Sequence, residues 1–281
     1  MPKVIIPNLP MFEKPECGAQ QVNECLWGEH VKAIGEPTNG YLECQRSADG
    51  YPGYVDTAGL MFDDTPLTVS PLSGDEPLTD SMLVTARATL LFVAPDIKSR
   101  VVWRLPLLAQ ISLDASPQQG IPAADQNRFV RTRDGFFALR SHLRAQYRKC
   151  PAIEFTPLKP LQYAESLFIG APYLWGGRTP DGTDCSGLVQ SVSTLAGIEL
   201  PRDSGPQEQF ISQTVEYPSR QPGDLVFWPG HVGILKVPSL LLHANAHSMD
   251  CRLESLDAVI ERAGEPSSIR RLPLPSRQEN F

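Results

Sequence analysis

The sequence predicts a multi-domain α+β protein in which two small β-barrels precede an α+β domain. Pro is abundant, with 27 among 281 residues, and together with Gly it divides short β-branched runs in the first half of the chain. This pattern is typical of strands and turns. Apolar residues at helical spacing occur mainly in the last segment. A chain of 281 residues suits two or three domains.

The first segment, residues 1–65, is expected to form a small barrel, because its strand-like pieces are short and closely spaced. These pieces are 30–34, 41–44 and 54–55, and turns at 36–40 and 49–50 separate them. A stretch rich in Pro, Ser, Asp and Gly, residues 63–80, predicts a linker.

Residues 66–155 are expected to contain most of this linker and a second barrel. The predicted strand-rich pieces are 82–92, a hairpin-like region at 101–113, and the strands 128–132 and 136–139 around an Asp-Gly turn. A strand, an Asp-Gly turn and an aromatic residue also occur in this order at Tyr51. We interpret the two segments as diverged copies of one barrel.

The third segment, residues 156–281, is expected to combine helices with strands. One helix is predicted at 160–168, and another at 183–197, which Thr183 or Asp184 can cap and Gly197 can end. The predicted strands are 224–228, 231–236, 240–246 and 268–272.

Composition argues against several classes of protein. The net charge is −7 and no basic run occurs, so nucleic-acid binding is not expected. No apolar stretch is long enough for a membrane span. The first residues lack the features of a signal peptide, which predicts a cytoplasmic protein. None of the six cysteines forms a C-x-x-C motif, and all except Cys185 are expected to be buried, reduced thiols.

Cys185 differs because it lies in the first turn of a predicted helix, where unpaired N–H groups favour a thiolate of lowered pKa. A buried structural cysteine is the alternative. His231 opens a strand after a Pro-Gly turn, and His243, Asn245 and His247 share one face of the next strand if it is regular. Any of the three could orient a base. A zinc site among these residues lacks a tight ligand spacing, and no metal is expected.

Six short blocks in order make residues 171–250 resemble the NlpC-type cell-wall cysteine peptidases, which have a papain-like α+β fold. The blocks are Pro172-Tyr-Leu-Trp-Gly-Gly, Asp184-Cys-Ser-Gly, Leu200-Pro-Arg-Asp-Ser, Pro222-Gly-Asp-Leu-Val-Phe, His231-Val-Gly-Ile and Leu242-His-Ala. The resemblance implies Cys185 as nucleophile, His231 as general base and His243 as the third residue. It also implies that Tyr173 binds the oxyanion. Core packing is the alternative for Tyr173 and Trp175, which is otherwise a substrate-binding candidate.

With the two barrels, which then resemble bacterial SH3-like domains, most of the chain is similar to the cytosolic γ-D-glutamyl-L-diamino-acid endopeptidases. These cut the γ-D-Glu to L-diamino-acid bond of murein peptides that carry a free N-terminal L-Ala, in cell-wall recycling. The resemblance implies substrate binding by Tyr51, Asp184, Ser186, Asp203 and Ser204. Relatives place an acidic residue ahead of the run that here is Val22 to Glu29. Gln20 occupies that place, and Glu24 is the nearby carboxylate.

Other functions stay open at this point. A secreted hydrolase could act on intact wall, a wall-peptide binding protein could use the same fold without catalysis, and an acyl-enzyme could transfer its acyl group to an amine. No cofactor is expected. The sequence predicts neither the oligomeric state nor which diamino acid follows the cut bond.

Overall fold

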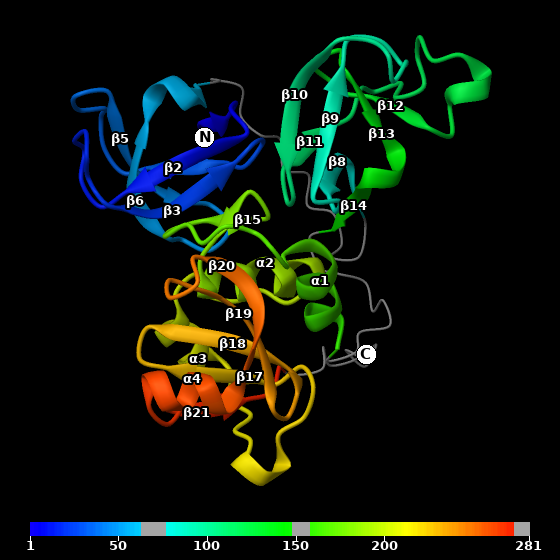
Figure 1. The fold of residues 1–281 in the computed structure, drawn as a ribbon. Coiled ribbons are helices and arrows are strands. Elements are labelled where there is room, and N and C mark those ends of the chain that lie inside the picture. Colours follow the sequence, from blue (N-terminus) through cyan, green and yellow to red (C-terminus); the bar gives the residue numbers. More distant parts are fainter. Residues whose placement is uncertain (63–76, 148–157, 273–281) are drawn as a thin grey trace, which may run out of the picture. The chain divides into compact units, whose positions relative to one another are not determined.

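The computed structural model describes residues 1–62, 77–147 and 158–272, and the chain divides into two compact units, Met1–Cys150 and Pro151–Phe281 (Figure 1). The boundaries expected after residues 65 and 155 lie outside the described residues, so the division into three domains stays a prediction. No helix in the described part of the chain is long and apolar enough to cross a membrane.

The first barrel is built from a five-stranded sheet of order β3-β2-β6-β5-β4 and a short pair, β1-β7. Its elements are β1 (Lys3–Val4), β2 (Asn8–Phe12), β3 (Gln21–Leu26), β4 (Val31–Ala33), β5 (Tyr41–Arg46), β6 (Pro52–Asp56), the 3₁₀ turn Thr57–Gly59 and β7 (Leu60–Met61). The three predicted strand pieces correspond to β4, β5 and β6. The core is apolar, with Leu9, Met11 and Val55 at 1% exposure or less.

The second barrel has two sheets, of order β10-β9-β13-β12 and β11-β8-β14. Its strands are β8 (Pro77–Val84), β9 (Ala88–Phe92), β10 (Val101–Pro106), β11 (Gln110–Ser112), β12 (Phe129–Arg131), β13 (Phe137–Leu139) and β14 (Leu143–Tyr147). The hairpin predicted at 101–113 is wrong, because β10 pairs with β9 and β11 pairs with β8. Of the linker predicted at 63–80, residues 63–76 lie outside the described chain and 77–80 belong to β8.

The same pattern of backbone hydrogen bonds recurs in both barrels. In the first, Val4 N–H donates to the Glu29 carbonyl and Gly28 N–H donates to the Val4 carbonyl, both at 2.9 Å. In the second, Val84, Ala109 and Leu108 make the equivalent pair of bonds at 2.9 Å. Gly28 and Leu108 both have positive φ, 82° and 67°, so the same left-handed position exists in each copy.

Trp27 joins the two barrels into one unit. Its carbonyl accepts a 2.8 Å hydrogen bond from Gln110 N–H at the start of β11. Its ring lies 5.5 Å from that of Trp103 and belongs to the core cluster of the second barrel. The adjacent Gly28 leaves no room for a side chain, because a Cβ there would lie 2.1 Å from the Gln110 carbonyl oxygen.

The second unit contains a five-stranded antiparallel sheet of order β20-β19-β18-β17-β21 with four helices. Its helices are α1 (Lys159–Leu167), α2 (Cys185–Leu195), α3 (Ser204–Phe210) and α4 (Leu256–Ala263). Its strands are β15 (Arg178–Thr179), β16 (Gly182–Thr183), β17 (Leu225–Trp228), β18 (His231–Val237), β19 (Leu240–Asn245), β20 (Asp250–Ser255) and β21 (Ser268–Arg270). The predicted helices and strands of this segment are present, whereas α3, α4, β15, β16 and β20 were not predicted.

Helix α2 is the buried element that carries Cys185. Leu188, Val189 and Val192 are fully buried, as their helical spacing predicts, and α2 packs against α1 and against β18 and β19 (Figure 1). Gly197 follows the helix with φ of 82°, the left-handed conformation that ends many helices. The first residue of the helix, Cys185, lies beside Gly230, which directly precedes β18.

The cysteines are mostly placed as predicted. Cys25, Cys44 and Cys251 are buried free thiols, and Cys150 lies outside the described residues. Cys17 is exposed, so the expectation that it is buried is wrong. It lies in the connection between β2 and β3, where the apolar pattern of the strands does not extend.

Candidate active site

The Cys185 sulfur lies beside the first residue of β18. Its S–H donates to the Gly230 carbonyl at 3.8 Å, and the Val232 N–H donates to the sulfur. Gly230 and Val232 are the two chain neighbours of His231. The Pro229-Gly230 turn, in which Gly230 has φ of 75°, reverses the chain so that Trp228 pairs with His231. The two residues singled out from the sequence, Cys185 and His231, are therefore brought together.

Hydrogen bonds continue from His231 across two further strands. His231 Nε2 lies 2.8 Å from His243 Nδ1 in β19, and His243 Nε2 lies 3.0 Å from Glu254 Oε2 in β20. Nδ1 of His231 is the ring nitrogen left for the cysteine. Among the three polar residues considered on β19 and beyond, His243 is fully buried and contacts His231, whereas His247 is exposed in the turn after the strand.

The pKa values of the pair indicate a neutral resting site. Burial raises the pKa of Cys185 to about 11, and the Asp184 carboxylate acts in the same direction, against the backbone N–H groups of Val232 and Ser186. Burial, followed by the charge of neighbouring His243, lowers the pKa of His231 to about 4. The expected lowering of the cysteine pKa is therefore wrong for the free protein, because desolvation of the thiolate outweighs the helix N-terminus.

A neutral thiol predicts a particular pH dependence of alkylation. We expect the rate at which iodoacetamide modifies Cys185 to keep rising with pH towards about 11, because the reactive thiolate forms only there. Mass spectrometry of the Cys185 peptide measures this rate, and exposed Cys17 provides an internal reference. A plateau reached below neutral pH would instead indicate a thiolate paired with a protonated His231.

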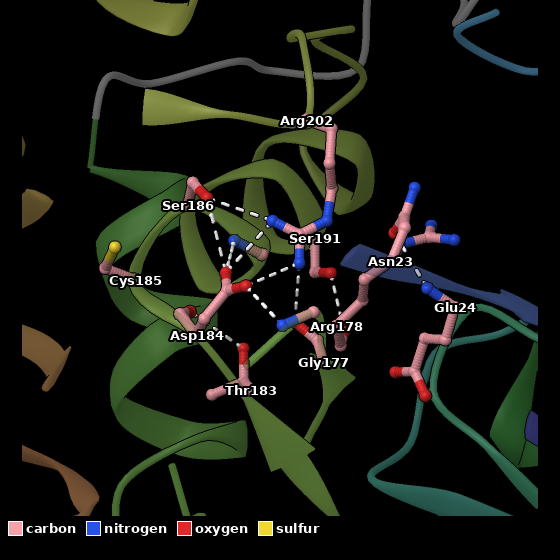
Figure 2. Close-up of polar contacts among 12 residues, drawn as sticks. Asn23, Glu24, Gly177, Arg178, Thr183, Asp184, Cys185, Ser186, Ser191 and Arg202 are labelled. Carbon is pink, nitrogen blue, oxygen red and sulfur yellow. Dashed lines mark hydrogen bonds and ion pairs between the residues drawn. The ribbon is translucent and has the colours of Figure 1, made fainter. Parts of the chain in front are cut away.

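Asp184 holds the start of α2 through hydrogen bonds to both of its carboxylate oxygens. Oδ1 accepts from Gly187 N–H at 2.7 Å and Oδ2 accepts from Gly176 N–H at 2.8 Å. Arg202 donates from Nη1 to Oδ1 at 3.0 Å and from Nη2 to Oδ2 at 2.6 Å. Figure 2 shows the two side chains pointing towards each other, with the Cys185 sulfur outside this network. Of the two predicted caps, Asp184 is the one used.

Ser186 belongs to the same network. Its hydroxyl accepts from Arg202 Nη1 at 2.9 Å and donates to Asp184 Oδ1 at 3.3 Å, as Figure 2 shows. Gln207 Nε2 in α3 donates to the Ser186 carbonyl at 3.0 Å and to the Pro201 carbonyl at 2.9 Å. The loop that carries Arg202 is thereby attached to the first turn of α2.

Tyr173 lies close to the nucleophile candidate. It forms a β-bridge with Thr183, which precedes Asp184 and Cys185 in the chain. Burial raises the pKa of the Tyr173 phenol, and the nearby Cys185 raises it further, so its O–H is a neutral donor at neutral pH. Trp175 has 55% of its surface exposed, so core packing does not explain it.

The other substrate-binding candidates belong to different units of the chain. Asp203 is the exposed residue before α3, and Ser204 is the buried first residue of that helix. Tyr51 lies in the first unit, after the Asp-Gly turn and against the core of the first barrel. Its part in a site with Cys185 stays a prediction. Over residues 1–62, 77–147 and 158–272, no group of three or more His, Cys, Asp or Glu side chains is placed to hold a metal ion.

Two family models match the chain. Residues 170–262 match the NlpC/P60 family, and this match includes α2, α3, most of α4 and the sheet strands β17, β18, β19 and β20 of the second unit. Residues 11–60 match the bacterial dipeptidyl-peptidase SH3 domain, which covers most of the first barrel.

Two curated relatives match over more than one unit. Dipeptidyl-peptidase 6 of Lysinibacillus sphaericus is 27% identical over 262 residues, which cover 88% of this chain and 88% of that protein. Gamma-D-glutamyl-L-lysine dipeptidyl-peptidase of Bacillus cereus is 29% identical over 208 residues, covering 72% of this chain and 55% of the relative. A solved NlpC/P60 family protein from Bacillus cereus has the same fold, with a TM-score of 0.76, 17% identity, and coverage of 97% of this chain and 99% of that one.

Proposed function

We propose that this chain, in which residues 170–262 match the NlpC/P60 family, hydrolyses the γ-D-Glu to L-diamino-acid bond of murein peptides that carry a free N-terminal L-Ala. One observation supports particular catalytic residues. The Cys185 sulfur is hydrogen-bonded to the backbone of Gly230 and Val232, the residues before and after His231, and the His231 ring is hydrogen-bonded to the His243 ring. Acyl transfer of this kind requires a nucleophile, a general base beside it, and a third residue that orients the base.

In the proposed mechanism, Cys185 attacks the γ-carbonyl carbon of D-Glu while His231 Nδ1 takes the thiol proton. The Tyr173 O–H and the backbone N–H of Cys185 donate to the oxyanion, and each such donor contributes about 3 kcal/mol to transition-state stabilisation. The intermediate collapses when His231 protonates the leaving amine of the diamino acid. Water then attacks the thioester, His231 accepts its proton, and the dipeptide L-Ala-D-Glu leaves while the proton returns to the Cys185 sulfur.

The specificity for a free N-terminus is proposed to depend on a carboxylate. The α-ammonium group of L-Ala needs a charged acceptor, and the exposed Asp203 beside α3 supplies one, with Ser204 next to it. Tyr51, Trp175, Asp184 and Ser186 are the further residues proposed to line the site. This specificity suits small wall fragments, which supports a function in cell-wall recycling in the cytoplasm.

The test is cleavage of L-Ala-γ-D-Glu-diaminopimelate, followed by mass spectrometry. We expect the wild-type protein to release L-Ala-D-Glu and Cys185→Ala to release none, whereas Cys17→Ala, which changes an exposed cysteine of the other unit, should keep full activity. Cleavage by Cys185→Ala would refute the nucleophile assignment.

The same assay separates the rival functions. We expect the N-acetylated tripeptide and intact murein to resist cleavage, because neither presents the free ammonium group. A secreted wall hydrolase would instead cleave intact murein. A binding protein without catalysis would bind the tripeptide, as measured by calorimetry, and leave it uncut. Replacing diaminopimelate by lysine in the substrate shows which diamino acid is preferred.

A further inference from the structure

Glu254 extends the hydrogen-bond chain one residue beyond the Cys185, His231 and His243 set. It lies in β20, the edge strand next to His243, and its Oε2 is 3.0 Å from His243 Nε2. Arg262 in α4 holds the same carboxylate through Nη1 to Oε1 at 2.6 Å and Nη2 to Oε2 at 2.9 Å. The carboxylate is thus bonded at both oxygens and oriented towards a fully buried imidazole.

His243 Nε2 has a second polar neighbour, which is a hydrogen-bond donor rather than an acceptor. The Asn245 amide nitrogen lies 3.1 Å from it. The amide orientation is settled by Ser248, whose N–H and hydroxyl donate to Asn245 Oδ1 at 2.9 and 3.0 Å. An amide nitrogen only donates, whereas an ionised carboxylate only accepts. Asn245 and Glu254 therefore favour different tautomers of the same ring.

The tautomer of His243 determines which nitrogen of His231 carries the proton, and so whether His231 can accept the proton of Cys185. If Nε2 of His243 carries its proton and donates to Glu254, Nδ1 accepts from His231 Nε2–H, and Nδ1 of His231 is free to take the Cys185 proton. If Asn245 donates to Nε2 instead, His243 Nδ1–H donates to His231 Nε2. The His231 proton then lies on Nδ1, facing the thiol, and the ring cannot act as base. Only the first tautomer allows the proposed reaction.

We propose that Glu254, oriented by Arg262, is a positioning residue that selects the tautomer of His243 and thereby of His231 in which the base faces Cys185. This inference rests on the proposed function for its kinetic consequences. A hydrogen bond to an ionised carboxylate is stronger than one from a neutral amide, so Glu254 prevails over Asn245. The hydrogen bond from Arg262, together with that from His243, lowers the pKa of Glu254 to about 2.

The charged groups around Glu254 keep it an acceptor at every working pH. Arg262 on α4 and Arg252 on β20 are the cations near it, His243 faces it from β19, and Asp250 is the other carboxylate near that ring. Because the lowered pKa leaves Glu254 ionised above about 2, the tautomer does not change between pH 5 and pH 9. A pH-independent kcat ratio between variants is therefore expected over that range.

Glu254→Leu is the decisive variant, because it removes the carboxylate that accepts from His243 Nε2–H. Asn245 still lies 3.1 Å from that nitrogen and can only donate to it, which stabilises the unproductive tautomer. We expect kcat for the tripeptide to fall roughly ten- to a hundred-fold, with KM changed less than about two-fold, because no substrate contact is lost.

A second substitution should restore activity if the tautomer is the cause. In Glu254→Leu with Asn245→Ala, the donor that favours the unproductive tautomer is removed as well, so kcat should recover several-fold over the single variant. Asn245→Ala alone should lower kcat less than Glu254→Leu does, because Glu254 still accepts from His243 Nε2–H. Asp250→Asn is the matched control, because Asp250 pairs with Arg252 on the same strand at 2.6 Å through both oxygens and should leave kcat unchanged.

Two outcomes would overturn the inference. One is an unchanged kcat in Glu254→Leu while Cys185→Ala is inactive, which would leave the proposed function intact. The other is a kcat in the double variant as low as in the single one, which would assign the loss to charge or packing. The nitrogen-15 chemical shifts of the His243 ring in the wild-type protein test the inference even if the variants do not fold. A proton on Nε2 supports the inference, and a proton on Nδ1 refutes it whether or not the protein cleaves peptides.

Discussion

Replacing Arg202 by methionine should lower the free energy of unfolding of the second unit by about 3 kcal/mol. Breaking a buried ion pair typically costs about 3–5 kcal/mol, because the remaining charge is left without its partner. The side chains of Arg202 and Asp184 are 1% and 9% exposed. Asp184 keeps its hydrogen bonds from Gly176 and Gly187, which places the expected loss at the lower end of this range.

Arg252→Met is the matched control for this measurement. Arg252 also forms a two-bond pair with an aspartate, Asp250, but its side chain is 50% exposed. Solvent screens exposed ion pairs, so the control should lower the free energy of unfolding much less than Arg202→Met does. Urea unfolding followed by circular dichroism measures both variants. Equal losses in the two would mean that the Asp184 and Arg202 pair is not a buried structural contact.

Local sequence patterns predicted the elements that carry Cys185 and His231. The apolar spacing of 188–195, a capping aspartate and a terminal glycine together specified α2, because each depends on residues within a few positions. The Pro229-Gly230 turn specified where β18 begins. The strand β2 was missed because Pro10 interrupts its apolar residues, and it is ordered by pairing with β3 and β6.

The outer part of the site could not be predicted from the same patterns. Glu254 and Arg262 read as ordinary surface charges, and only the pairing of β20 with β19 and the position of α4 bring them to His243. Arg202 lay within a recognised block, but its role needs the buried contact with Asp184. The direction of the Cys185 pKa shift depends on burial, which the neighbouring residues in the sequence do not reveal.

The close approach of α2 to the loop before it gives the second large effect. A methyl group at Gly187 would lie 2.1 Å from the Gly177 carbonyl oxygen and 3.0 Å from Asp184 Oδ1. The first atom is backbone and cannot rotate away, so the start of α2 must move. We expect Gly187→Ala to lose about 3 kcal/mol of stability, the upper part of the usual range for overpacking.

The movement should also reach the chemistry, because Cys185 lies in the same helical turn as Gly187. A displacement of about 1 Å at a reacting group costs about a hundred-fold in rate, so kcat/KM of Gly187→Ala should fall by roughly that factor. Gly205→Ala, in α3, is the control, because a Cβ there meets no atom within 4 Å and stability should change by about 1 kcal/mol or less. Full activity in Gly187→Ala would show that the first turn of α2 can move without displacing the sulfur from His231.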